Sequence, residues 1–368
     1  YKRQVMINWN QFTVDNGAIT DLRELLFLTV YDDPDIDLTV TTKTGVTNGQ
    51  KLGYINDLGD VGEKGGGCDP TYTSVNITGI QKEWELGGWE IPKEICYEDL
   101  ENTIAESSLN TGTDIAYLQD TPYWDVVLMP LLEKAIREMF WRIVWFGDKD
   151  AKNIADGGIL KAGIKPALFT MCDGLWKRLQ AIIAANPKQQ TKIAANTATE
   201  KVSSTDTVTY AAQKNGLLTP GTAIKIFDTL LSDADSRIFD DSKAAIFCTT
   251  SMFKALRTDI VERYGKTTMP FENVGAGITL SEYDGRPIYA IDIWDRMIAK
   301  YEDNGTALNC PHRAIVCSPE NLFVGTNDKD KIANLSISFN DKDRKNYIYA
   351  ASKIGTLVGE DALVQVAI

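Results

Sequence analysis

The residues that could carry catalysis are few, and the single histidine is the first to consider. His312 follows Pro311 at the start of a predicted strand. A general base needs a hydrogen-bonded partner and a cleft, and neither is visible in the surrounding sequence. The nucleophile motif G-x-S-x-G is absent as well. The sequence therefore predicts a structural or surface role for His312, and no enzyme activity.

Glycine-rich and acidic segments could in principle bind phosphate or a cation. Residues 62–67 read GEKGGG, which does not match the phosphate-binding motif G-x-x-x-x-G-K-[ST] and is not followed by an amphipathic helix. Two acidic clusters lack the spacing of a calcium loop: Asp32, Asp33, Asp35 and Asp37, and Asp328, Asp330, Asp341 and Asp343. A carboxylate pair for glycoside hydrolysis stays open, because such a pair is defined by its separation in space. We expect no metal and no cofactor.

The cysteines and the net charge exclude further classes of protein. Six Cys occur without any C-x-x-C pair, which indicates reduced thiols and neither a zinc nor a redox site. The net charge is −13, from 38 basic and 51 acidic side chains, and no basic stripe suited to nucleic acid is present. No stretch approaches the roughly 20 apolar residues that a membrane-spanning helix requires.

The first third of the chain predicts elements that cannot be stable alone. Residues 1–30 read as an extended arm, and residues 38–43 and 74–78 are rich in β-branched side chains and predict strands. The glycine-rich segment between them predicts a protruding hairpin. An isolated two-stranded hairpin is marginally stable in water, so we expect it to lie on another surface, such as a neighbouring subunit.

The longest predicted helix covers residues 121–146, with Thr121 as N-cap and Pro122 at the first helical position. Pro130 predicts either a kink or the true start of this helix. The tryptophans are expected in the core rather than in a stacking site: Trp84, Trp89, Trp124, Trp141 and Trp145.

The second half of the chain is predicted to be rich in strands. Further helices are predicted at 175–185, after residues 219–221, and from 250 to 256. Buried strands are predicted at 244–248 and 314–317, a turn at Asp284-Gly285, and two final strands at 346–354 and 362–368. This order of elements predicts a mixed α+β fold.

Four stretches, in this order, resemble the major capsid proteins of tailed bacteriophages of the Hong Kong 97 type. They are residues 89–99 (WEIPKEICYED), the helix 126–146 closing on Gly147-Asp148 with residues 157–160 (GGIL), residues 244–256 with 280–292, and residues 340–347 with 359–364. The resemblance covers nearly the whole chain. Lys149 stands where the family often has a second glycine, which is a small departure.

The resemblance implies a Hong Kong 97-like fold and a division of the chain. The implied parts are an N-terminal arm (1–35), an extended loop (36–93), a peripheral domain with its spine helix 121–146 (94–218 and 334–368), and an axial domain (219–333). Candidate contacts between subunits are Lys43, Lys51, Lys64, Gly65, Gly66, Gly67, Asp341, Asp343 and Arg344. No motif assigns a cross-link to any one lysine.

The resemblance also implies a function and partners. A subunit of this kind assembles in the host cytoplasm into pentamers and hexamers of an icosahedral shell, and the virion encloses double-stranded DNA without reading its sequence. Expected partners are other copies of the chain, a scaffolding protein or cleaved leader, a portal protein and a maturation protease, and no membrane. The chain begins at Tyr1, which indicates either a trimmed chain or a leading segment removed by proteolysis. Two alternatives remain: a nanocompartment shell of the encapsulin type, and a carboxylate-based hydrolase.

Overall fold

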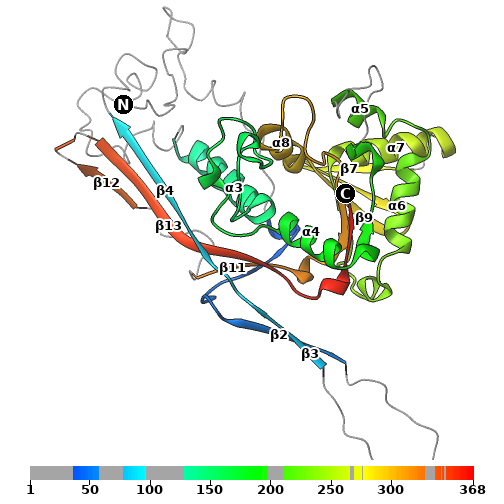
Figure 1. Ribbon diagram of the computed structural model, residues 1–368, viewed down its shortest axis with the longest axis horizontal. Helices are drawn as coiled ribbons and strands as arrows, with labels where there is room; N and C mark the ends of the chain where they lie inside the picture. Colours follow the sequence, from blue (N-terminus) through cyan, green and yellow to red (C-terminus); the bar gives the residue numbers. More distant parts are fainter. Residues whose placement is uncertain are drawn as a thin grey trace, which may run out of the picture.

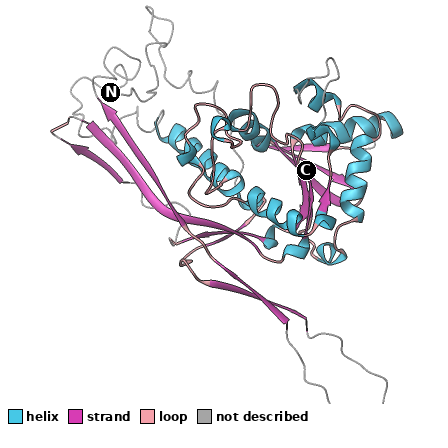
Figure 2. Cartoon of the chain, viewed as in Figure 1, coloured by secondary structure: helices cyan, strands magenta, loops and turns pink. Residues whose placement is uncertain are grey.

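The computed structural model describes residues 36–57, 78–96, 128–197, 210–265, 269–275, 277–327, 336–340, 342–343 and 345–368. Within these ranges the chain is a mixed α+β structure, as the sequence predicts, with helices gathered around one sheet while a second sheet and a hairpin extend away from them (Figures 1 and 2). The predicted arm, the hairpin tip and the strand at 74–77 lie outside the described residues, as do Trp124 and the start of the 121–146 helix.

A seven-stranded sheet forms the centre of the helical part, in the order β5-β14-β10-β6-β9-β8-β7. Its strands are β5 (Gln190–Thr191), β6 (Ala245–Cys248), β7 (Phe271–Gly275), β8 (Ile278–Tyr283), β9 (Arg286–Ile291), β10 (Ala314–Cys317) and β14 (Val364–Ala367). Both faces of β6 are buried: Ala245 and Phe247 pack in one core cluster, and Ile246 and Cys248 in another. Burial on both faces explains why β6 and β10 read as uninterrupted apolar runs.

The helices divide between these two faces. The described helices are α3 (Met129–Phe146), α4 (Leu175–Ala185), α5 (Tyr210–Asn215), α6 (Thr222–Ser232), α7 (Thr250–Tyr264) and α8 (Asp292–Tyr301). Helices α6 and α7 share one core cluster with the sheet, whereas α3, α4 and α8 share the other. Short 3-10 helices occupy Ile36–Leu38, Ile154–Asp156, Pro166–Leu168, Pro187–Gln189, Ala194–Thr197, Ser236–Asp240, Pro319–Asn321 and Asp361–Leu363.

Three indole rings from three helices meet where α3, α4 and α8 pack together. The ring centroid of Trp145 lies 4.6 Å from that of Trp294 and 5.4 Å from that of Trp176, and the last two are 5.0 Å apart. The guanidinium of Arg313 lies 5.2 Å from the Trp176 centroid and pairs with the buried Glu302 carboxylate. Large aromatic surfaces at edge-to-face angles fix the helices in one arrangement.

A second sheet is organised by one long strand, β13 (Lys345–Val358). It also contains β1 (Thr41–Lys43), β4 (Gly87–Cys96), β11 (Leu322–Thr326) and β12 (Ser336–Asn340). Strand β4 pairs antiparallel with β13 over ten residues, and the two form a ribbon that runs away from the helices (Figure 1). Helix α3 covers its inner face, where Phe140 meets Trp89 edge-on.

Several sequence predictions are confirmed by these elements. Helix α3 ends at Phe146, α4 matches the predicted 175–185, and Pro130 lies in the first turn of α3 as described. The buried strands, the Asp284-Gly285 turn, where both residues have positive φ, and the final strands are also present. Four of the five expected core tryptophans are at most 3% exposed: Trp84, Trp89, Trp141 and Trp145.

Two predicted elements have different bounds in the structure, and α8 lies where no helix is predicted. The strand predicted at 38–43 is a strand only from Thr41, because Thr39 instead closes a turn through its amide and hydroxyl bonds to the Ile36 carbonyl. Helix α7 continues to Tyr264 rather than ending at Leu256, since the polar residue Asp259 is buried beneath α6. Helix α8 was not predicted at all.

The predicted hairpin exists, but its first strand is a different one. Strands β2 (Lys51–Asp57) and β3 (Thr78–Glu83) pair antiparallel and form a separate two-stranded sheet. The segment at 41–43 that was expected to form the hairpin instead pairs parallel with β11. The hairpin leaves the molecule beside β11 and points away from the helices (Figure 1).

Candidate subunit interfaces and buried polar sites

The base of the hairpin is anchored by a small apolar cluster. Trp84 packs there with Val46, Phe323 and Leu357, apart from the main core. Gly325 of β11 leaves the space that the indole occupies: a Cβ at this position would come within 2.6 Å of the Trp84 ring. Only a residue without a side chain lets the ring lie flat against this strand.

Backbone hydrogen bonds complete the anchor. The Trp84 amide donates to the Gln50 carbonyl, and the Gly49 amide donates to the Trp84 carbonyl, both at 2.9 Å. The Leu86 amide donates to the side-chain oxygen of Asn48 at 2.9 Å. The side chains that the structure describes on β2 and β3 are those at 51–53 and 81–83. Among them Leu52 packs against the Trp84 cluster, Lys51 is exposed, and no separate apolar cluster forms.

The ribbon of β4 and β13 presents an outer face without a covering element among the described residues. Tyr349 is 46% exposed and lies opposite Pro92, and Tyr347 lies opposite Glu94. Lys345 pairs with Glu94 at 2.9 Å. Tyr347 is half-buried, so Tyr349 is the exposed aromatic side chain of this pair, and tyrosine is enriched in protein–protein interfaces.

A second exposed apolar patch lies at the edge of the seven-stranded sheet. Strand β7 is the last strand of this sheet; Phe271 is 48% exposed and Val274 is 57% exposed. The Arg257 guanidinium lies over the Phe271 ring, 4.0 Å from its centroid, and Tyr264 nearby is 61% exposed. An edge strand with exposed aromatic side chains is a surface for pairing with another chain.

Three of the nine predicted contact residues lie within the described chain. Lys43 is exposed at the end of β1, with its ammonium 5.5 Å from the Phe323 ring centroid. Lys51 is the exposed first residue of β2. Asp343 is exposed beside the β12–β13 turn and accepts hydrogen bonds from Asn340 and Tyr347. Outside the described residues lie Lys64, Gly65, Gly66, Gly67, Asp341 and Arg344.

His312 has partners that the sequence did not reveal. It is 5% exposed, its Nδ1 lies 2.8 Å from the Ser251 hydroxyl, and its Nε2 lies 3.0 Å from the Gln213 carbonyl. The carbonyl is an acceptor only, so Nε2 carries the proton and the serine donates to Nδ1. Burial lowers the pKa of His312. A neutral, buried imidazole with both nitrogens satisfied has the structural role that the sequence predicts.

The same network holds two distant segments together. The Asn196 side chain exchanges two hydrogen bonds with the backbone of His312, at 2.8 and 2.9 Å. The Gln213 amide donates to the Asn196 carbonyl at 3.2 Å and to the Leu308 carbonyl at 2.7 Å. Residues 196 and 213 are thereby fixed side by side.

A buried carboxylate caps helix α7. Asp295 of α8 accepts from the Thr250 amide at 2.7 Å and from the Ser251 amide at 3.4 Å. Burial raises the pKa of Asp295 to about 6, although the bonds from Thr250 oppose this shift. The hydrogen bonds from the α7 amides stabilise the charged form of Asp295, and burial of the carboxylate destabilises it.

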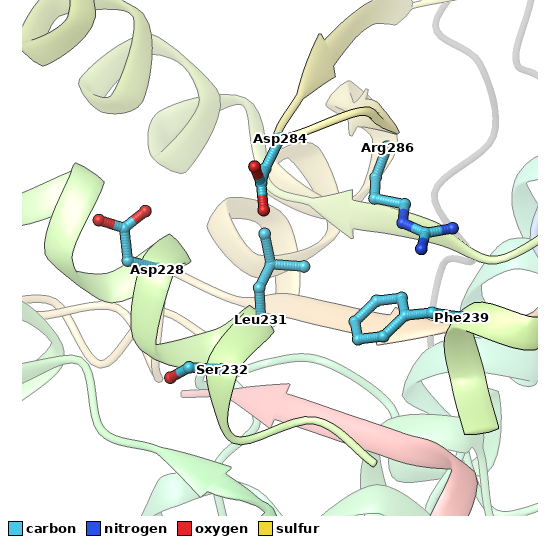
Figure 3. A pocket seen from close by; sticks show the side chains of 6 residues that line it. All are labelled: Asp228, Leu231, Ser232, Phe239, Asp284 and Arg286. Atoms are coloured by element: carbon cyan, nitrogen blue, oxygen red, sulfur yellow. The ribbon is translucent and has the colours of Figure 1, made fainter. Parts of the chain in front are cut away.

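One described hollow of about 410 Å³ lies between α6, the 3-10 helix Ser236–Asp240 and the β8–β9 turn (Figure 3). Asp228 and Asp284 line one side, while Arg286 lies over the Phe239 ring, 4.6 Å from its centroid. Asp228 already accepts the Tyr283 hydroxyl at 2.5 Å. The hollow brings two carboxylates, one guanidinium and the Ser232 side chain together at the surface.

No group of three or more His, Cys, Asp or Glu side chains is placed to hold a metal ion in the part of the chain that the structure describes. None of the described helices is long and apolar enough to cross a membrane.

Solved structures with a similar arrangement are capsids of phages and of a GTA particle. The satellite phage P4 procapsid structure is 13% identical, with 89% of this chain and 92% of that chain covered and a TM-score of 0.43. The native GTA particle capsid is 9% identical, with 96% of this chain and 94% of that chain covered and a TM-score of 0.47. The bacteriophage PhiM1 mature capsid is 10% identical, with 96% of this chain and 90% of that chain covered and a TM-score of 0.48. The expected similarity to phage capsid proteins is found in these structures. No protein-family model and no curated protein matches the sequence.

Sequence reasoning missed the residues that anchor the hairpin and those that surround His312. Trp84 and Gly325 are separated by more than 200 positions, and no local pattern signals their contact. Ser251 lies near the start of the helix predicted from residue 250, and no local pattern indicates that its hydroxyl also donates to His312. Partners of this kind become visible only once the sheet brings the strands together.

Proposed function

We propose that this chain is a structural subunit of a bacteriophage capsid. The observation that carries the proposal is the β2–β3 hairpin, which is firmly anchored at its base but has no described core of its own. Two-stranded hairpins are stable when they pack on another surface. A neighbouring copy of the chain supplies such a surface in a closed shell.

The exposed surfaces support assembly from many copies. The β7 edge and the outer face of the β4–β13 ribbon lie on different sheets, so one subunit offers separate patches to different neighbours. Separate patches that join identical copies head to tail generate closed rings. We assign these rings to pentamers and hexamers of an icosahedral shell in the virion, around double-stranded DNA, assembled in the host cytoplasm.

The finer division belongs to the same proposal. Residues 1–35 serve as the arm, 36–93 as the extended loop, 94–218 with 334–368 as the peripheral domain, and 219–333 as the axial domain. Within 36–93, β2 and β3 stand off the body, whereas β1 and β4 belong to the five-stranded sheet. Scaffolding, portal and protease partners follow from this role, and the nine predicted contact residues remain proposed contacts between subunits.

Electron microscopy of expressing cells and of the purified chain tests the proposal. We expect round, closed particles of uniform size. A matched variant replaces residues 58–77 by a short Gly-Ser turn, which leaves the Trp84 anchor intact. This variant should keep the circular dichroism and tryptophan fluorescence of the parent chain, yet form no particles.

The two alternatives give different results in the same experiments. A nanocompartment of the encapsulin type also forms closed particles, but these copurify with a protein cargo rather than with DNA. A carboxylate-based hydrolase stays monomeric and melts at a higher temperature when an oligosaccharide is added. A stable monomer with this ligand response would refute the capsid proposal.

A further inference from the structure

The chain passes between the two large sheets at three places, from β4 to β5, from β10 to β11 and from β13 to β14, and the last two connections lie side by side. Residues 318–321 lead from β10 of the seven-stranded sheet to β11 of the five-stranded sheet, and residues 359–363 lead back from β13 to β14. We call this pair of segments the crossover. The crossover therefore joins the two sheets directly, beside the core that they share.

Asn321 joins the two segments of the crossover. Its carbonyl accepts from the Gly359 amide at 2.8 Å, and its side-chain oxygen accepts from the Glu360 amide at 2.7 Å. Its side-chain amide donates to the Glu360 carbonyl at 2.9 Å. Arg237, beside α6, adds an ion pair with Glu360 at 2.9 Å. The crossover is thus a hydrogen-bonded unit and not a pair of loose loops.

One side chain of the hairpin reaches this unit. The ammonium of Lys82, on β3, donates to the Val358 carbonyl at 2.9 Å and to the Asp361 carboxylate at 2.5 Å. Lys82 is 22% exposed and Asp361 is 52% exposed, so this pair is reached by solvent and by salt. Two residues farther along the chain, Trp84 is packed against Gly325 and does not depend on charge.

We propose that the hairpin is mounted as a pivot and a latch: Trp84 is the pivot, and Lys82 is the latch that holds the hairpin against the crossover between the sheets. With the latch closed, the hairpin has one direction relative to the body. With it open, the hairpin swings about Trp84 while its base stays packed. The direction of the hairpin and the geometry of the crossover therefore change together.

The latch is suited to opening because it is weak and the pivot is strong. A partly exposed ion pair is weak because water and salt screen it, whereas truncation of a buried Trp removes a large packed apolar surface. Loss of the latch should then raise the ratio of open to closed hairpins about five-fold without unfolding the base.

The test measures the direction of the hairpin by single-molecule energy transfer. Dyes are attached through unnatural amino acids at the exposed positions Gln81 on the hairpin and Asp156 on the body. The chain is studied unassembled and dilute, so the result does not depend on whether it forms a shell. Lys82→Met should raise the ratio of open to closed states about five-fold and so broaden the distance distribution, and Lys82→Arg should restore the narrow one.

Two controls separate the latch from a general loosening. Lys51→Met removes an exposed ammonium from the paired strand and should leave the distribution unchanged. Adding 1 M NaCl should broaden the parent distribution but not that of Lys82→Met. If Lys82→Met and the parent chain give the same distribution, the latch does not exist, and a failure of the chain to assemble would bear only on the proposed function.

Discussion

Replacing Asp295 by asparagine separates two opposing effects at the N-terminus of helix α7. As a carboxylate, Asp295 caps the helix and interacts favourably with its dipole, effects worth about 1 kcal/mol. As a buried charge, it carries a desolvation cost. Burial raises its pKa from 3.8 to about 6, and two pKa units correspond to about 3 kcal/mol. The cost of burial should therefore outweigh the cap above pH 6.

The sign of the pH dependence follows from the raised pKa. A carboxyl group whose pKa is higher in the folded state contributes stability that is fully present below its unfolded pKa of 3.8. This contribution is lost as the pH rises through about 6. The amide that replaces the carboxylate in Asp295→Asn keeps an oxygen that accepts from Thr250 but does not titrate, so the variant does not lose stability in this range.

Urea unfolding of both chains between pH 4 and pH 7.5 measures this directly. We expect the free energy of unfolding of Asp295→Asn, relative to the parent chain, to rise by about 3 kcal/mol across that range. Groups shared by both chains, such as Glu138 and His312, cancel in the difference. A relative stability that falls as the pH rises would show that the charged cap outweighs burial, and the reasoning would be wrong.

Further predictions concern packing and buried groups elsewhere. Gly325→Ala should destabilise the fold by about 1–3 kcal/mol in urea unfolding, because its Cβ would come within 2.6 Å of the Trp84 ring; an unchanged midpoint would argue against the anchor. Glu302→Gln leaves the Arg313 charge buried without a carboxylate and should cost about 3–5 kcal/mol in the same assay. Burial raises the pKa of Cys172 to about 12, so its thiol should resist alkylation at pH 8 until the chain unfolds, as followed by mass spectrometry.

The elements that sequence predicts well are those with one dominant local signal. Helix α3 ends where Gly147 follows an apolar face, and β6 and β10 are short apolar runs between polar turns. At Asp284-Gly285, both residues take the positive φ that their types favour. In these places local preference and the final fold agree.

The errors arose where a polar residue has a distant partner. Helix α7 extends past its predicted end at Leu256 and includes Asp259, whose carboxylate accepts from the Ala223 and Ile224 amides and caps α6. Thr39 has β-branched character but uses its hydroxyl to close a turn and to accept from Trp145. Neither partner can be read from neighbouring positions.

The sequence of α8 does carry the apolar periodicity of a helix. Its buried residues recur at helical spacing: Ile293, Trp294, Met297, Ile298 and Tyr301. Strand β9 ends at Ile291 and α8 begins at Asp292. The spacing of apolar residues therefore changes from a period of two to a period of 3.6 without a Gly or Pro to mark the boundary. The contact between Trp84 and Gly325 has no such local signal, because nothing in the sequence near Trp84 points to Gly325.

The hydrogen bonds that fix Asn196 beside Gln213 also determine where this chain can accept foreign sequence. Positions 198–209 lie outside the described ranges. The hydrogen bonds of Asn196 and Gln213 attach the residues on either side of these positions to the rest of the protein. With both ends fixed, lengthening the connection costs only about 0.6 kcal/mol for each doubling of its length. A peptide inserted between positions 198 and 209 should therefore leave these hydrogen bonds in place and lower the stability of the fold only slightly.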